Sequence, residues 1–161
     1  MNAETPKGKA PVRAQLRTQG RELALQLLYS FEQNKYIDDG ALLIDDSAED
    51  DTQVSDPEAL ILAKALLAGF AKERVAVDAA IDKRLENWTI HRLAVLDRAL
   101  LRLGTYEILY CLDTPPKVAI NECIELAKRF GSEAKTPGLV NGVLDKIARE
   151  HRSGEVGAKK I

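Results

Sequence analysis

Apolar residues recur at helical spacing through most of this 161-residue chain, and no segment alternates apolar and polar residues as a strand does. The pattern is clearest in residues 118–148. Two apolar stripes there flank Gly131, and glycine often ends a helix because it adopts the left-handed conformation at little cost. The stripes consist of Ile120, Ile124 and Ala127, then Val140, Val143, Leu144 and Ile147. The sequence therefore predicts two short helices in this region, each burying one side.

Three longer helices are predicted upstream. The first runs from about residue 13 or 16 to residue 33, and its second half is apolar nearly all round, as in a central helix. The second spans about residues 57–85, preceded by a capping box of Ser55 and Glu58. The third spans about residues 93–110 and is ended by prolines. These helices predict an all-α fold, in which we expect two small helical bundles to share one core.

The environments of four residues follow from this helix assignment. Gly69 and Gly142 lie inside predicted helices, so we expect neighbouring helices to pass close to them. Arg98 and Arg102 are interpreted as solvated charges on the third helix.

The chain divides into three parts by composition. Residues 1–12 hold two prolines, a glycine and lysines, which predicts a flexible basic arm. Residues 13–152 form the helical domain, and residues 153–161 form a polar tail. Within the domain, the acidic residues 38–56 are weakly periodic and predict a loop, whose role the sequence leaves open.

Charge is distributed unevenly along the chain. The formal net charge of −2 does not by itself indicate a nucleic-acid-binding protein. However, residues 1–21 carry five basic side chains against one acidic side chain, a local charge of +4. Residues 36–58 carry nine acidic side chains and no basic one. A local basic site is therefore compatible with the weakly acidic total.

Several functional classes find little support in the residue types. Cys111 and Cys123 are the only cysteines, and neither they nor the two histidines have the spacing of metal ligands, so we expect no metal and no cofactor. Glu122 and Glu125 lack an accompanying nucleophile or base, so we expect no enzyme activity. No apolar run reaches the roughly 18 residues of a membrane span. The start of the chain lacks the apolar core of a signal peptide, and we expect a cytoplasmic protein.

Five blocks of sequence, in order, resemble the NusB family of bacterial transcription antitermination factors. Together they cover roughly residues 17–150. The blocks are ELALQLLYSFE (22–32), LLAGF (66–70), LDRALLRLGTYEIL (96–109), PPKVAINECIELAKRFG (115–131) and LVNGVLDKIA (139–148). The resemblance implies a NusB-like helical protein that pairs with NusE, a ribosomal protein. The pair is expected to bind boxA RNA in nascent ribosomal RNA transcripts and to join the elongating RNA polymerase with other Nus factors.

The resemblance places an arginine-rich RNA-binding motif at the start of the first helix. This segment reads RTQGR here, so Arg17 and Arg21 carry over, and Arg13 lies one helical turn earlier. Guanidinium groups bind phosphate oxygens and stack on unpaired bases. From spacing alone, a solvated basic helix start is the alternative.

A second RNA contact is implied just before the VNG sequence, where the family often has a basic residue followed by an aromatic one. This chain has Gly138 and Leu139 at those places. Lys135 is the candidate for the missing charge, and Phe130 remains as a nearby aromatic residue. The alternative for Leu139 is a place in the core stripe with Val143, and Phe130 has the same alternative as a core residue.

Tyr29 and Asp97 match family positions that face NusE. The alternatives are a core aromatic residue and an ordinary helix charge. A second function also stays open, that of a protein-interaction module that forms homodimers or binds NusE with little RNA binding of its own. The sequence does not decide between a monomer and a homodimer, nor does it give the RNA preference and affinity.

Overall fold

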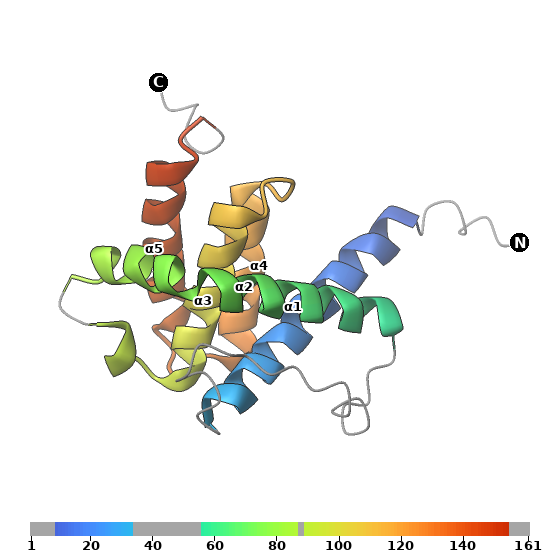
Figure 1. Cartoon of the computed structure of the whole chain (residues 1–161), viewed down its shortest axis with the longest axis horizontal. Coiled ribbons are helices and arrows are strands. Elements are labelled where there is room, and N and C mark those ends of the chain that lie inside the picture. Colours follow the sequence, from blue (N-terminus) through green and yellow to red (C-terminus); the bar gives the residue numbers. More distant parts are fainter. Residues whose placement is uncertain (1–8, 34–55, 87–88, 155–161) are drawn as a thin grey trace, which may run out of the picture.

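The computed structural model describes residues 9–33, 56–86 and 89–154, and within these ranges the chain is helical with no strand (Figure 1). The elements are α1 (Lys9–Gln33), α2 (Pro57–Arg84), η3 (Ile90–Arg92), α3 (Val95–Tyr110), α4 (Pro116–Phe130) and α5 (Thr136–His151). The all-α prediction is confirmed. Helix α1 begins at Lys9, so residues 9–12 of the predicted arm lie in it. The remainder of the arm, most of the acidic segment and the end of the tail lie outside the described residues.

Helix α3 is the central element of the fold. It packs against α1 and α2 on one side of the molecule and against α4 and α5 on the other, while α2 runs across the front of the view in Figure 1. Two small bundles therefore share α3. The prediction that α1 is the central helix is wrong. Gln26, Tyr29 and Ser30 of its second half face solvent.

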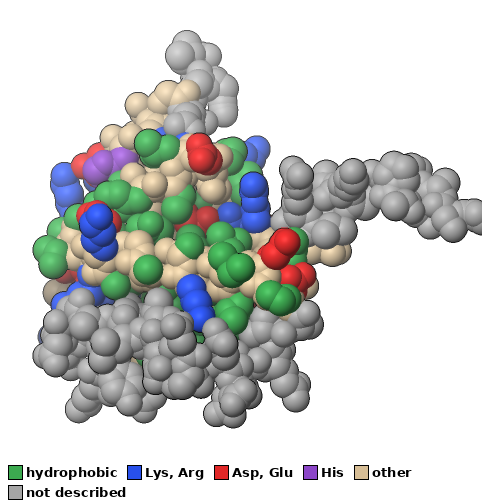
Figure 2. Space-filling view, turned by 45° about the vertical axis from the view of Figure 1, so that its right-hand side comes forward, with side chains coloured by type: hydrophobic (Ala, Val, Ile, Leu, Met, Phe, Trp, Pro, Cys, Tyr) green, Lys and Arg blue, Asp and Glu red, His purple; other side chains and the backbone are tan. Residues whose placement is uncertain are grey.

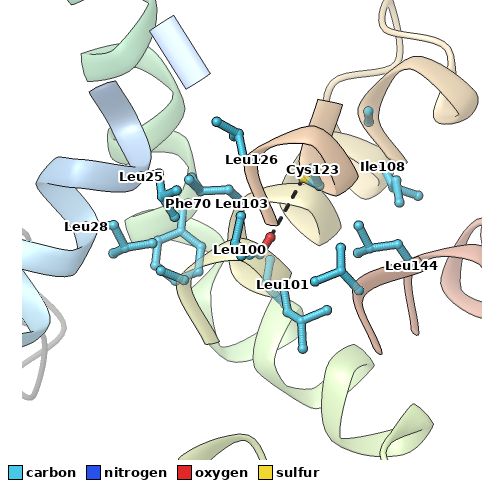
Figure 3. Packing of buried hydrophobic residues seen from close by; sticks show 14 of the residues in the cluster. Leu25, Leu28, Phe70, Leu100, Leu101, Leu103, Ile108, Cys123, Leu126 and Leu144 are labelled. Atoms are coloured by element: carbon cyan, nitrogen blue, oxygen red, sulfur yellow. Dashed lines mark hydrogen bonds between the residues drawn. The ribbon is translucent and has the colours of Figure 1, made fainter. Parts of the chain in front are cut away.

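Leucines of α3 form the middle of the core. Figure 3 shows Leu100, Leu101 and Leu103 between side chains of α1 and α2 and those of α4 and α5. The outer side chains in this view include Leu25, Leu28, Phe70, Leu126 and Leu144, all of them buried. Fully burying one such side chain stabilises the folded state by roughly 1.5–3 kcal/mol. This continuous core fixes the ends of α1, α3, α4 and α5 relative to one another.

Two arginines of α3, the buried Arg102 and the half-buried Arg98, connect α3 to α1 and α2. Arg102 is only 3% exposed and donates hydrogen bonds to Asp78 of α2 and Glu32 of α1, each at 2.9 Å. Arg98 pairs with the same Glu32 and donates to the carbonyl oxygen of Leu93 at 3.1 Å. The interpretation of these arginines as solvated charges is therefore wrong. Their acidic partners lie on other helices, far away in the sequence.

Three glycines test the predictions made for them, at Gly69, Gly142 and Gly131. A Cβ on Gly69 would lie 1.8 Å from the hydroxyl oxygen of Tyr106, so the close helix contact is confirmed there. A Cβ on Gly142 would meet nothing within 4 Å, so the close contact predicted at this position is wrong. Gly131 ends α4 as predicted, but with φ −59° rather than in a left-handed conformation. It is required by space instead, because a Cβ there would lie 2.5 Å from the carbonyl oxygen of Ala127.

The start of α2 is capped one residue later than the sequence suggested. The side chain of Asp56 accepts a hydrogen bond from the backbone N–H of Glu58 at 2.9 Å, and Pro57 occupies the first turn. Ser55, the predicted cap, lies outside the described residues.

Candidate nucleic-acid interface

The three arginines of the predicted basic stripe do not share one environment. Arg17 is exposed on α1, whereas Arg21, one turn later, is only 6% exposed. Arg13 lies in α1, but its side chain is outside the described part of the structure. Arg17 is therefore the one described side chain of the three that solvent reaches freely.

Arg21 forms a buried ion pair with Glu107 of α3. Its Nε donates to the two carboxylate oxygens at 2.8 and 3.0 Å, and its Nη2 donates to one of them at 2.9 Å. Burial lowers the pKa of Arg21, but the hydrogen bonds and charge of Glu107 outweigh this effect and raise the pKa above its ordinary value. The guanidinium thus links α1 to α3 through Glu107. This geometry gives no support to a phosphate contact at Arg21.

The carboxylate of Asp97 also makes its hydrogen bonds within the chain. It is 7% exposed in the first turn of α3. Its carboxylate accepts hydrogen bonds from the Ser132 hydroxyl at 2.8 Å, from the Ser132 backbone N–H at 3.2 Å and from the Thr136 hydroxyl at 3.3 Å. Ser132 belongs to the connection between α4 and α5, and Thr136 is the first residue of α5. Asp97 therefore fixes this connection, and little of its side chain is left for a partner protein.

Tyr29 and Phe130 lie together on the walls of one cavity of about 490 Å³. Tyr29 comes from the second half of α1 and is exposed, and Phe130 is the last residue of α4 and is half-buried. Leu25, Val95 and Leu96 supply further apolar walls. The structure thus joins an expected partner residue to an expected RNA residue on one mainly apolar surface.

Lys135 and Leu139 lie on a second cavity, of about 380 Å³. Lys135 is exposed and pairs with Glu133 at 3.5 Å. Leu139 is half-buried and packs against the core while also facing the cavity, so it combines both alternatives left open by the sequence. Arg92 of η3 adds a second basic side chain to these walls.

The connection between α4 and α5 separates the two cavities. Ser132 lines the first, whereas Glu133, Lys135 and Thr136 line the second, and Ala94 lines both. Because Asp97 binds Ser132 and Thr136, one carboxylate holds a wall of each cavity. This arrangement holds a mainly apolar cavity beside one whose walls carry two basic side chains, Arg92 and Lys135, and two acidic ones, Asp97 and Glu133.

Two basic residues of this region were missed from the sequence. The guanidinium of Arg129 lies 4.7 Å from the ring centre of Phe130 and pairs with Glu22 of α1 at 3.0 Å. Arg92 was missed because η3 has only three residues, too few to show a helical period. The only available signal for Arg129 was its position beside Phe130, and adjacent residues on a helix do not normally face one another.

Other site types find no support in the described residues. No group of three or more histidine, cysteine, aspartate or glutamate side chains among them is arranged to hold a metal ion. None of the helices described is long and apolar enough to cross a membrane.

The sequence model of the NusB family matches residues 18–149 of this chain. The transcription antitermination protein NusB of Myxococcus xanthus is 40% identical over 132 residues, which cover 82% of this chain and 94% of that protein. The protein of the same name from Anaeromyxobacter dehalogenans strain 2CP-1 is 45% identical over 135 residues, which cover 82% of this chain and 89% of that protein.

Solved structures give the same picture. NusB from T. maritima matches with a TM-score of 0.72 at 36% identity, covering 84% of this chain and 92% of that chain. A chain in a complex of the antitermination factors NusB and NusE with dsRNA matches with a TM-score of 0.69, covering 84% of this chain and 98% of that chain. At 24% identity, this second likeness concerns the fold alone.

Proposed function

The chain belongs to the NusB family, and we propose that it acts as a transcription antitermination factor. In this proposal it pairs with a NusE protein and binds boxA-type RNA in nascent ribosomal RNA transcripts. The pair then joins the elongating RNA polymerase together with other Nus factors. It acts by binding alone, without a cofactor, in the cytoplasm where transcripts are made.

The observation that carries this proposal is the pair of cavities on either side of the connection between α4 and α5. The cavity of Tyr29 and Phe130 is mainly apolar and is assigned to side chains of NusE. The cavity of Lys135, Leu139 and Arg92 is assigned to RNA, because arginine and lysine bind phosphates and a leucine wall accommodates a base. Arg17 on α1 is assigned to a further phosphate.

In this proposal Asp97 is a positioning residue, not a direct contact with NusE. Its carboxylate positions the connection that forms a wall of each cavity, so it affects the NusE and RNA surfaces through Ser132 and Thr136. Arg21 likewise acts through the packing of α1 on α3 rather than by touching RNA.

A protein-interaction module with little RNA binding of its own is the second candidate. Two observations favour it. The burial of Arg21 removes one basic side chain from the RNA surface, and Leu139 replaces a possible aromatic contact. Leucine cannot stack as a ring does, and base stacking on an aromatic side chain is worth roughly 1–3 kcal/mol.

Titration of a boxA-type RNA with the protein, in the presence and absence of NusE, separates the two functions. The first predicts saturable RNA binding that NusE strengthens. Arg17→Ala should weaken this binding and flatten its log–log salt dependence by roughly 0.7, the contribution of one single-strand phosphate contact.

The control is Lys72→Ala, which removes the same charge from the exposed side of α2. It should leave both the affinity and the salt slope unchanged. If the protein binds NusE but RNA binding is absent with and without NusE, the second function is correct and the first is rejected.

A further inference from the structure

A third cavity, of about 490 Å³, lies between the first half of α1, the start of α2 and the end of α3. It is separate from the two cavities described above and shares no wall residue with them. Its walls include Arg17, Leu62, Leu66, Tyr110, Leu112 and Asp113. Figure 2 faces this side of the molecule, where hydrophobic side chains gather with a few basic and acidic groups between them.

An aromatic stack ends at this cavity. The rings of Tyr106 and Tyr110 are stacked, with centres 5.6 Å apart and planes inclined by 27°. Tyr106 packs closely over Gly69 of α2, and only Tyr110 reaches the cavity wall. Tyr110 is 39% exposed, so the stack ends with an aromatic surface open to solvent.

Leu112 adds an apolar wall to the cavity, in a connection that hydrogen bonds hold in place. Leu112, in the connection between α3 and α4, is 67% exposed. The buried Arg152 donates hydrogen bonds to the carbonyl oxygens of Leu112 and Thr114 at 3.1 and 2.8 Å. This connection therefore keeps its shape without a ligand, which lowers the entropy lost on binding.

The charges around the cavity suit a flat heterocyclic ring with one phosphate group beside it. Arg17 is exposed at the wall, and Asp113 is an exposed acid. The charges of Arg21 and Glu107 neutralise each other in their ion pair. A densely charged anion is therefore disfavoured, whereas a flat heterocycle beside one arginine is accommodated.

We propose that this cavity binds a nucleobase of an RNA strand that continues beyond the boxA-type element. The base stacks on Tyr110 between Leu62 and Leu112, and Arg17 contacts the adjoining phosphate. Aromatic stacking accepts any base, so the site extends the contact length without adding sequence preference. This inference rests on the proposed RNA-binding function, because it needs a strand that already passes Arg17.

The test compares a boxA-type RNA with the same RNA extended at either end by a short run of adenosines, both measured with NusE present. In the unchanged protein, one of the two extensions should tighten binding. Tyr110→Leu should weaken binding of the extended RNA by roughly five- to a hundredfold. It should leave the affinity for the unextended RNA unchanged. Tyr110→Phe, which keeps the ring, should retain the gain. A fluorescent adenine analogue in the extension should be quenched by the unchanged protein and by Tyr110→Phe only.

Equal affinity for extended and unextended RNA in the unchanged protein overturns the inference and leaves the proposed function intact. Absence of binding to either RNA, with NusE binding preserved, rejects both. Melting temperatures of the variants establish that each one is folded. If Tyr110→Leu leaves the RNA gain unchanged but alters the oligomeric state in sedimentation, the surface contacts a second copy of the chain and the nucleobase site is rejected.

Discussion

Arg21 and Asp97 illustrate how far single residues could be interpreted from the sequence. Both were identified as important, and both proved to be buried contacts within the chain rather than exposed contact residues. The spacing of arginines along α1 shows that they share a side of the helix. It does not show that Glu107, 86 positions away, lies under one of them. Long-range partners of charged residues are therefore what the sequence could not supply.

The buried ion pair predicts a large difference between two neighbouring arginines. Arg21→Ala leaves the Glu107 carboxylate buried without its partner and should lower the free energy of unfolding by about 3–5 kcal/mol. Arg17→Ala, at an exposed position, should change it by less than about 0.5 kcal/mol. Urea denaturation monitored by circular dichroism measures both. Similar stability of the two variants would contradict the structural role of Arg21.

The carboxylate of Asp97 should matter for stability as well as for partner binding. Asp97→Ala leaves the backbone N–H of Ser132 and the hydroxyl of Thr136 without their acceptor, so a loss of about 1–3 kcal/mol is expected. Ser132→Ala removes one of these donors and should have a smaller effect. If Asp97→Ala has unchanged stability but lost NusE affinity in calorimetry, Asp97 contacts the partner directly.

The two thiols should differ in reactivity. Burial, reinforced by the charge of Glu107, raises the pKa of Cys123 far above its ordinary value, and burial also raises the pKa of the half-exposed Cys111. Since the thiolate is the reactive form, both cysteines should be alkylated more slowly than a free cysteine at neutral pH. Raising the pH should accelerate modification of Cys111 first. Cys123 should react only when the protein unfolds, which mass spectrometry after timed alkylation can establish.

At the scale of the helices, periodicity was sufficient to place four of the five long elements to within a few residues. It failed to identify α3 as the central helix, because the buried side of α3 includes Arg102, Thr105 and Glu107. These polar residues interrupt the apolar pattern, although all three are buried. Conversely, the second half of α1 has enough apolar residues to suggest full burial, yet Tyr29 remains exposed beside a cavity.

Two helical glycines offer a matched comparison. Gly69→Ala would place a Cβ within 2.4 Å of the Tyr106 ring, which is held by its stack with Tyr110, and should destabilise the protein by about 1–3 kcal/mol. Gly142→Ala meets open space and should stabilise α5 by about 0.5–1 kcal/mol. Thermal melts of the two variants should shift in opposite directions. A shift of equal sign would contradict the packing at Gly69.

At the scale of the whole molecule, the arrangement of the surfaces depends on one short connection. The sequence resemblance assigned Tyr29 to the partner, and Phe130, Lys135 and Leu139 to RNA. The fold groups them differently, with Tyr29 and Phe130 on one cavity and Lys135 and Leu139 on the other. This grouping depends on how the end of α4 and the start of α5 pack against α3. The local sequence does not determine that packing.

The second cavity leads to a prediction about the dependence of RNA binding on NusE. Leu139 faces about 380 Å³ of open space on one side and the core on the other, so a larger ring has room to extend outward. Leu139→Phe should therefore supply the missing stacking surface and strengthen binding of a boxA-type RNA by the protein alone by roughly 1–3 kcal/mol. NusE should then add less to the affinity than it adds for the unchanged protein, because the new ring already supplies part of the RNA contact.

Leu139→Met is the control, since it keeps the apolar volume without a ring and should change neither the affinity nor the melting temperature by much. If Leu139→Phe lowers the melting temperature without a gain in affinity, its ring has been forced into the core beside Val143. That result would make Leu139 a packing residue and leave Lys135 and Arg92 as the RNA contacts of this cavity.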